Sequence, residues 1–217
     1  MSSRADGAVL SYLGLRRAVG MIGILLPFVL VAGDLTLGGD GLRDSISRYY
    51  YSPMRDVFVG SLCAVGVFLF CYRYERPDNR LANITGTAAI AVALLPTRPD
   101  GAATTAATVV GYLHLAAATV FFAGLAWFCL VLFTRGGSGT RSKAARNLVY
   151  RVCGATIVTC LVLAALDAAL VPDAVAERFH TLFWLEAVAI LAFGVAWFVK
   201  GDTILKDPPT QDPAPVI

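Results

Sequence analysis

The chain has 217 residues, of which 57% are hydrophobic and only 15% charged, and its mean hydropathy is +0.68. This composition excludes an ordinary soluble domain of the same size. The net charge of +3 is small and the basic residues are dispersed, so no nucleic-acid partner is expected. The sequence therefore predicts a protein embedded in a lipid bilayer.

Six apolar runs reach or come close to the length that a spanning helix needs, roughly 17 residues at the lower limit. They cover residues 18–33, 53–72, 81–96, 109–133, 148–170 and 180–199. The first run has no small-residue cleavage site after it, and we interpret it as an uncleaved span instead of a signal peptide. The runs predict an all-α fold, a polytopic membrane bundle of six transmembrane helices.

The distribution of basic residues predicts the orientation of this bundle. With the N-terminus inside, 13 of the 18 Lys and Arg residues lie on the inner side and 5 on the outer side, and such an excess marks the cytoplasm. We therefore expect a cytoplasmic segment over residues 1–17, a six-helix domain over 18–200 and a proline-rich, disordered cytoplasmic tail over 201–217. The five cysteines fall within apolar runs and are interpreted as packing residues.

The stretch 45–60, SISRYYYSPMRDVFVG, joins a polar, tyrosine-rich segment to the second apolar run. Asp56 lies on a helix face with Gly60 and Cys63, and small residues of this kind mark a face that packs against other helices. Asp56 is therefore predicted to point into the bundle. Arg55 and the polar residues before it are predicted to form the rim of a binding site; these are Ser47, Tyr49 and Tyr50.

Ionisable residues recur near the predicted outer ends of the other spans. His114 lies 21 residues before Arg135 and His180 lies 20 before Lys200, which places both histidines roughly 30 Å above the inner boundary at 1.5 Å per residue. Charged groups inside a span are costly and usually face a cavity or a partner. The candidate catalytic residues are accordingly Asp56, His114, His180, Asp167 and Glu186.

Two histidines and a carboxylate at one height suggest a metal site. His114, His180 and Asp56 are the proposed ligands for zinc or another divalent transition metal that would activate water, although no local ligand spacing supports this. Structural alternatives stay open for each residue. Asp56 would favour the positive end of a helix dipole, the tyrosines would form an interfacial belt, and the histidines would make structural hydrogen bonds.

Four blocks carry a resemblance to a known group of proteins: ISRYYYSPMRDVFVG, GVFLFCYRY, AIAVALLPT and AFGVAWFVKGD. Through them, most of residues 18–202 resembles an uncharacterised family of bacterial six-span integral membrane proteins. A looser resemblance is to the alkaline ceramidase and adiponectin-receptor superfamily of membrane hydrolases, which combine Ser, Asp and three zinc-binding His. That superfamily has seven spans and a His-x-x-x-His pair in the last one, whereas here Trp184 follows His180 by four residues.

The first resemblance implies a multi-pass protein of the bacterial cytoplasmic (inner) membrane. The polar layer predicts an outward-facing pocket, and we expect a metal-assisted hydrolase acting on a lipid or an amide. The alternatives are a small-molecule or proton-coupled transport or binding protein, with Asp167 and Glu186 carrying protons or a cationic substrate, and an accessory structural subunit. Membrane lipid is an expected partner, together with a small-molecule or lipid ligand.

Overall fold

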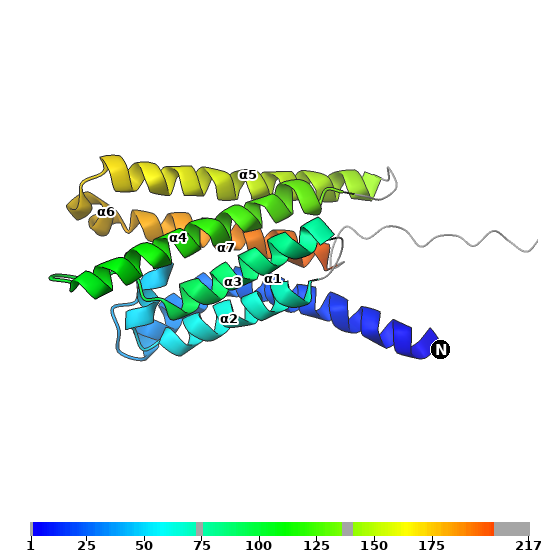
Figure 1. Ribbon diagram of the computed structural model, residues 1–217, viewed down its shortest axis with the longest axis horizontal. Helices are drawn as coiled ribbons and strands as arrows, with labels where there is room; N and C mark the ends of the chain where they lie inside the picture. Colours follow the sequence, from blue (N-terminus) through cyan, green and yellow to red (C-terminus); the bar gives the residue numbers. More distant parts are fainter. Residues whose placement is uncertain (1, 73–75, 136–140, 202–217) are drawn as a thin grey trace, which may run out of the picture.

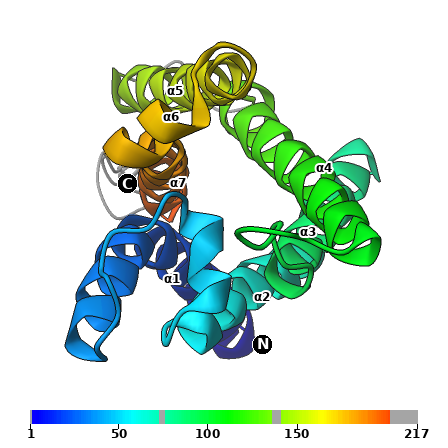
Figure 2. The same ribbon diagram turned by 90° about the vertical axis from the view of Figure 1, so that its left-hand side faces the viewer.

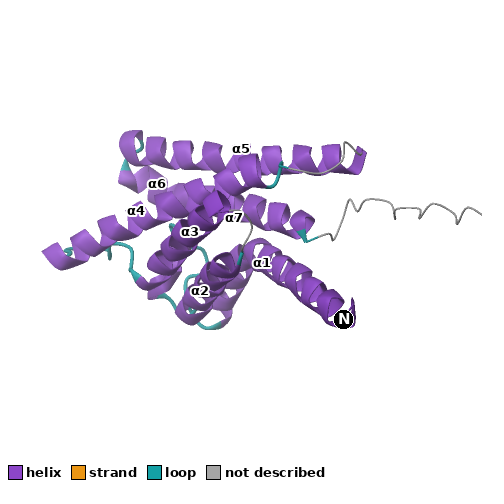
Figure 3. Cartoon of the chain, turned by 45° about the vertical axis from the view of Figure 1, so that its right-hand side comes forward, coloured by secondary structure: helices purple, strands orange, loops and turns teal. Residues whose placement is uncertain are grey.

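The computed structural model describes residues 2–72, 76–135 and 141–201, and this part of the chain is all-helical, without a strand (Figures 1 and 3). The elements in chain order are α1 (Ser2–Thr36), the 3-10 helix η1 (Ile46–Tyr51), α2 (Arg55–Cys71), α3 (Arg76–Leu94), α4 (Thr105–Trp127), the π-helical continuation η2 (Phe128–Leu132), α5 (Arg141–Leu170), the short α6 (Asp173–Phe179) and α7 (Thr181–Lys200). The all-α prediction is confirmed.

Four helices in the described part are long and apolar enough to cross a membrane: Leu13–Thr36, Thr105–Leu132, Arg141–Leu170 and Thr181–Lys200. They support the membrane class that the composition predicted. The other two predicted runs are also helices, but α2 has only 17 residues and α3 begins with Arg76, Asp78 and Arg80. By length and composition alone, α2 and α3 therefore do not qualify as spans.

The long helices run alongside one another, and most of the connections described below lie at one end of the bundle (Figure 1). We call this the loop end; it includes residues 37–52, the connection from α3 to α4, and α6. Helix α7 packs against both α1 and α5, while α3 packs against α2 and α4. The chain therefore closes on itself through α1 and α7, its first and last helices.

Helices α1 and α7 approach closely because glycines face each other across their contact. A Cβ atom on Gly23 would lie 2.8 Å from the Cα atom of Gly194, and one on Gly20 would lie 2.6 Å from the backbone nitrogen of Phe198. Backbones that pack this tightly are a common way of associating helices in lipid, where no hydrophobic force drives them together.

An aromatic cluster fills the core at the opposite end of the bundle. Trp197 of α7 is fully buried, and its ring centroid lies 5.0 Å from Phe68, 5.2 Å from Tyr72 and 5.1 Å from Phe133. All three pairs are edge-to-face, the geometry that aromatic quadrupoles favour. This cluster joins α7 to α2 and to the end of η2.

The prediction that Asp56 points into the bundle is wrong. Asp56 and Gly60 are exposed, whereas Phe58, Leu62 and Val65 are buried. The inner face of α2 is formed mainly by large side chains, which fill the space between helices, together with Gly66. Asp56 lies in the first turn of α2, where its charge favours the positive end of the helix dipole.

Two boundaries also differ from the prediction. Helix α1 begins at Ser2, so residues 2–17, predicted as a separate cytoplasmic segment, continue into the first span as one helix. The last helix was predicted to begin at His180, but α7 begins at Thr181. His180 lies between α6 and α7 in the left-handed conformation, with φ 48° and ψ 43°, which is uncommon for a residue other than glycine. Apart from Gly201, the predicted tail 201–217 lies outside the described residues.

Candidate functional site

Residues 37–52, which we call the cap segment, fold back over the loop end of the bundle between α1 and α2. Asp34 at the end of α1 holds the first half of this segment. Its buried carboxylate accepts hydrogen bonds from the Gly41 backbone N–H at 3.0 Å and from Arg43 Nε at 3.2 Å. Gly41 has φ 81°, a conformation that a side chain would strain. The buried charge of Asp34 is thus paired with Arg43, as buried charges require.

Glu186 of α7 holds the second half of the cap segment. Its Oε2 atom accepts hydrogen bonds from the backbone N–H groups of Ile46 at 2.7 Å and Ser47 at 3.4 Å. These are first-turn donors of η1, which have no partner within the helix itself. Within the described part of the chain, no side chain or backbone group donates to Oε1. Glu186 therefore stabilises the cap segment through one oxygen only.

The three tyrosines of the cap segment have different environments. Tyr49 is fully buried, and its hydroxyl donates to the Gly41 carbonyl. Burial, followed by the nearby Asp34 charge, raises the pKa of Tyr49 to about 12. Tyr51 is 45% exposed and donates to the Thr97 carbonyl at 2.7 Å. Tyr49 is consequently a core residue and not part of a rim.

Arg55 and Tyr50 do lie together at the surface of the loop end. Arg55 Nη2 donates to the Tyr50 hydroxyl at 2.8 Å, and the guanidinium carbon lies 4.4 Å from the centre of the same ring. Arg55 is exposed and Tyr50 half-buried. The predicted rim therefore reduces to this pair, while Ser47 is a buried residue of the cap segment.

His180 and Asp167 both fasten the start of α7. His180 Nδ1 lies 3.0 Å from Asp44 Oδ1, and the Phe183 backbone N–H donates to the Asp44 carbonyl at 2.9 Å. Because a carboxylate can only accept, Nδ1 carries the proton in this hydrogen bond. Asp167 of α5 accepts from the Thr181 hydroxyl at 2.9 Å. Both sequence-predicted residues thus make structural contacts between α7 and its neighbours.

His114 of α4 is buried and reaches the end of α3. Its Nδ1 lies 2.7 Å from the carbonyl oxygen of Leu95, the residue after that helix. The carbonyl can only accept, so Nδ1 is the donor. The last carbonyls of a helix lack partners within the helix, and His114 satisfies one of those at the end of α3. This is the structural alternative that the sequence left open for the residue.

The residues proposed as metal ligands do not gather. His114 contacts the end of α3, His180 contacts the cap segment, and Asp56 is exposed on α2. Among the described residues, no group of three or more His, Cys, Asp or Glu side chains has an arrangement that could hold a metal ion. The donor set predicted for zinc thus does not fit a single ion, and no chemistry is derived from one.

An apolar cavity of about 440 Å³ lies between α4, α5 and α7. Seen from the loop end, α5 lies between α4 and α7 in the bundle (Figure 2). Most lining side chains are apolar, including Leu115, Phe122 and Leu161; Thr119 and Glu186 are the polar ones. The volume falls within the range of roughly 300–1,000 Å³ that is typical of small-molecule sites.

A small chamber of about 20 Å³ lies on the other side of Glu186, beneath the cap segment. Its walls come from the cap segment and from α2, α3, α4 and α7, and include Ile46, Ser47, Phe58 and Phe121. Glu186, Ala118 and Phe122 line both this chamber and the larger cavity. These three residues therefore separate the two spaces.

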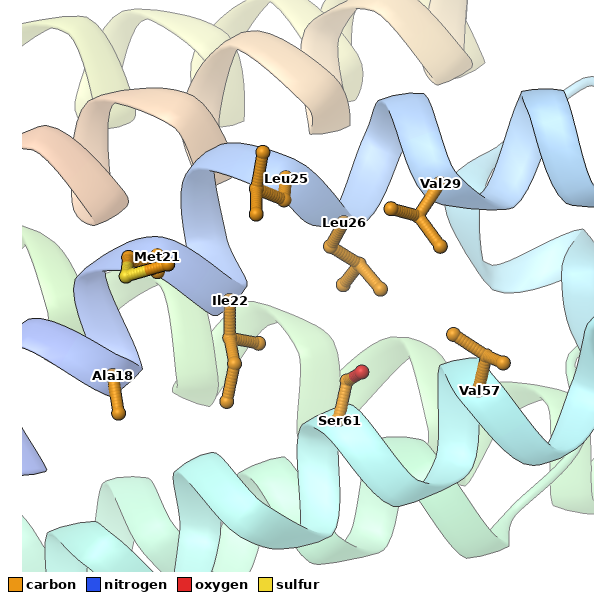
Figure 4. A pocket seen from close by; sticks show the side chains of 8 residues that line it. All are labelled: Ala18, Met21, Ile22, Leu25, Leu26, Val29, Val57 and Ser61. Atoms are coloured by element: carbon orange, nitrogen blue, oxygen red, sulfur yellow. The ribbon is translucent and has the colours of Figure 1, made fainter.

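A further groove of about 360 Å³ lies between α1 and α2. Figure 4 shows that its lining is aliphatic apart from Ser61, with Met21, Ile22 and Leu25 on the α1 side. It holds no charged residue, so nothing in it selects a particular head group. The cavity at Glu186 differs from it in having a carboxylate.

Sequence reasoning found Glu186 but missed three residues whose contacts hold the cap segment in place: Asp34, Arg43 and Asp44. A signal for them was present. In the stretch GDLTLGGDGLRD, the residues after Asp34 include three glycines, two further aspartates and one arginine, a composition typical of a turn wrapped around a polar side chain.

Comparison of the chain with protein-family models, with curated proteins and with solved structures finds no match. The resemblances drawn from the sequence blocks therefore stay predictions. The candidate site rests on the geometry of Glu186, the cap segment and the cavity between α4, α5 and α7.

Proposed function

We propose that this chain is a membrane protein that binds an amphipathic, positively charged small molecule, with the alkyl part in the cavity between α4, α5 and α7 and the charged head at Glu186. The observation that carries the proposal is a single carboxylate in the wall of a mainly apolar cavity of about 440 Å³. An apolar wall favours an alkyl chain through burial. A carboxylate in the cavity wall favours a cation, because a charge in apolar surroundings is stabilised by a partner of opposite sign.

This proposal corresponds to the binding or transport alternative of the sequence analysis. The cavity is lined by helices whose outer surfaces are apolar, so a membrane-soluble ligand can reach it from the lipid without crossing water. The metal-assisted hydrolase stays a prediction, but the dispersed positions of His114, His180 and Asp56 give it no support.

We further propose that the chain crosses the membrane six times, with both termini in the cytoplasm of a bacterium and the loop end outside. In support, α2 packs against α1 and α3 packs against α4, and both α1 and α4 are long apolar helices. Their 17 and 19 residues correspond to about 26–28 Å at 1.5 Å per residue, close to the hydrocarbon thickness of roughly 30 Å.

The test is binding of radiolabelled dodecylamine to the full chain in lipid nanodiscs, with dodecanol as a neutral ligand of the same length and empty nanodiscs as the partition blank. Wild type is expected to bind the amine more tightly than the alcohol. Glu186→Gln keeps a hydrogen-bond acceptor for Ile46 and Ser47 but removes the charge. It should lower amine affinity by roughly tenfold or more, since a hydrogen bond to a charged group contributes about 1.5–3 kcal/mol.

The matched control is Glu177→Gln, which removes an exposed carboxylate on α6, away from the cavity. It should leave both affinities unchanged. Equal binding of dodecylamine by wild type and Glu186→Gln would show that Glu186 does not recognise a cation and would refute the proposal.

A further inference from the structure

The two spaces that Glu186 lines differ in size, and each suits a different part of an amphipathic ligand. The cavity between α4, α5 and α7, which we call the outer cavity, measures about 440 Å³ and has room for an alkyl chain. The chamber beneath the cap segment measures about 20 Å³, enough for a group the size of one water molecule. A primary ammonium group is of that size, whereas a trimethylammonium group is several times larger.

The chemistry of the small chamber also suits a primary ammonium group. Such a group has three N–H donors and needs acceptors. Glu186 and Ser47 both line the chamber. Ser47 bonds to Glu186 through its backbone N–H, and its hydroxyl has no hydrogen-bond partner in the described part of the chain. The hydroxyl and the carboxylate therefore form a pair of acceptors at one point of an otherwise apolar chamber.

Three side chains separate the two spaces, so a group must pass them to reach the small chamber. Phe122 and Ala118 of α4 line both spaces together with Glu186, while the neighbouring Phe121 lines only the small chamber. Phe122 is half-buried and lies between the outer cavity and the chamber. Its ring thus limits the size of any group that reaches Ser47.

Building on the proposed function, we infer that this protein selects amphiphiles with a primary ammonium head, which passes Phe122 and lodges between Glu186 and Ser47, and excludes quaternary ammonium heads. Charge alone does not distinguish these two heads, because both carry one positive charge. Selection comes from the volume of the chamber and from the hydroxyl of Ser47, to which a quaternary head has no N–H group to donate.

The experiment compares dodecylamine with dodecyltrimethylammonium in the nanodisc assay, because both have the same chain length and charge. Wild type is expected to bind the primary amine roughly tenfold more tightly, as overfilling a packed site is costly. Phe122→Ala should admit the larger head and so reduce the ratio of the two affinities, primary amine over quaternary ammonium, to about threefold or less. Ser47→Ala should weaken only the primary amine, because it removes an acceptor and leaves the volume almost unchanged.

Ile22→Ala in the groove between α1 and α2 (Figure 4) is the control for shortening an apolar side chain outside this site. It should leave the ratio as in wild type. Equal binding of the two ligands by wild type, with both lost in Glu186→Gln, would overturn the inference and leave the proposed function standing. Binding of neither ligand would overturn both. If Phe122→Ala does not fold, Ser47→Ala tests the inference by itself. An affinity ratio in Ser47→Ala equal to that of wild type would contradict the inference.

Discussion

At the scale of single residues, two carboxylates fold the cap segment. Asp34 pairs with Arg43 and accepts from the Gly41 N–H, and Glu186 accepts from the N–H groups of Ile46 and Ser47. A loop packed against helices contains backbone donors that water cannot reach, and these must find acceptors. The acidic side chains supply them, so their burial serves folding as well as the proposed recognition of a cation.

Tyr49 gives a prediction about pH. Burial, and then the charge of Asp34, raises the pKa of its phenol from 10.0 to about 12. A group whose pKa is higher in the folded state adds stability that is fully present below the unfolded pKa and is lost as the pH rises through the folded one. The thermal unfolding midpoint of wild type should therefore fall between pH 10 and about 12, and the fall should be smaller in Tyr49→Phe.

The control for this experiment is Tyr112→Phe, which alters a tyrosine that is 67% exposed. It should show the same alkaline decline as wild type. Ultraviolet absorbance of tyrosinate, followed during the same titration, should lose a component at about pH 12 in Tyr49→Phe and keep it in Tyr112→Phe. An unchanged titration in that variant would contradict the assignment of the raised pKa to Tyr49.

Individual residues also show where sequence reasoning succeeds and fails. Glu186 was identified because an acid in the middle of an apolar run is costly and must have a partner. Asp56 was misplaced because small neighbours were taken to mark the packed face, whereas Phe58 and Leu62 form it. The partners of His114 and His180, the Leu95 carbonyl and Asp44, lie 19 and 136 residues away in the chain. No local pattern specifies such contacts.

At the scale of elements, the sequence predicted helices well because each apolar run is long and uninterrupted. The six runs correspond to α1, α2, α3, α4 with η2, α5 and α7. It did not predict η1 or α6. Both are short and are fixed by contacts with other elements: the η1 N–H groups bond to Glu186 on α7, and α6 ends at His180, which contacts Asp44.

The packing of α7 gives a prediction about stability. Trp197 is fully buried among rings from α2, η2 and α7, with Phe128 and Phe193 centred 5.9 Å and 6.0 Å away. Trp197→Ala would leave a large cavity where these elements meet, and such changes cost about 3–5 kcal/mol in protein cores. We expect a clear fall in the thermal unfolding midpoint in detergent.

Trp127→Ala is the matched control, because the same side chain is removed from a position that is 53% exposed. Its effect on the midpoint should be small, since an exposed tryptophan has little protein packing to lose. Similar midpoints for the two variants would mean that the aromatic cluster does not hold α7 against α2.

At the scale of the whole molecule, helix packing and membrane crossing are separate questions. Helices α2 and α3 pack against each other and α3 packs against α4. Among the described helices, however, only α1, α4 with η2, α5 and α7 are long and apolar enough to cross a membrane by length and composition alone. A polar start to α3 is acceptable in a spanning helix if it lies at the membrane surface. Arg135 Nη1 lies 3.0 Å from Asp78 Oδ1 in an ion pair that joins α3 to the chain just after η2, which suits such a position.

The number of crossings can be tested with single cysteines in a chain whose five native cysteines are replaced by alanine. Arg80→Cys lies near the start of α3 and Ala102→Cys in the connection from α3 to α4, and both positions are exposed. With six crossings, a membrane-impermeant maleimide added to intact cells should label Ala102→Cys and should reach Arg80→Cys only after lysis. With four crossings, α2 and α3 would form a hairpin on the outer side. Both cysteines would then be labelled in intact cells, because the chain would not cross between residue 37 and residue 104.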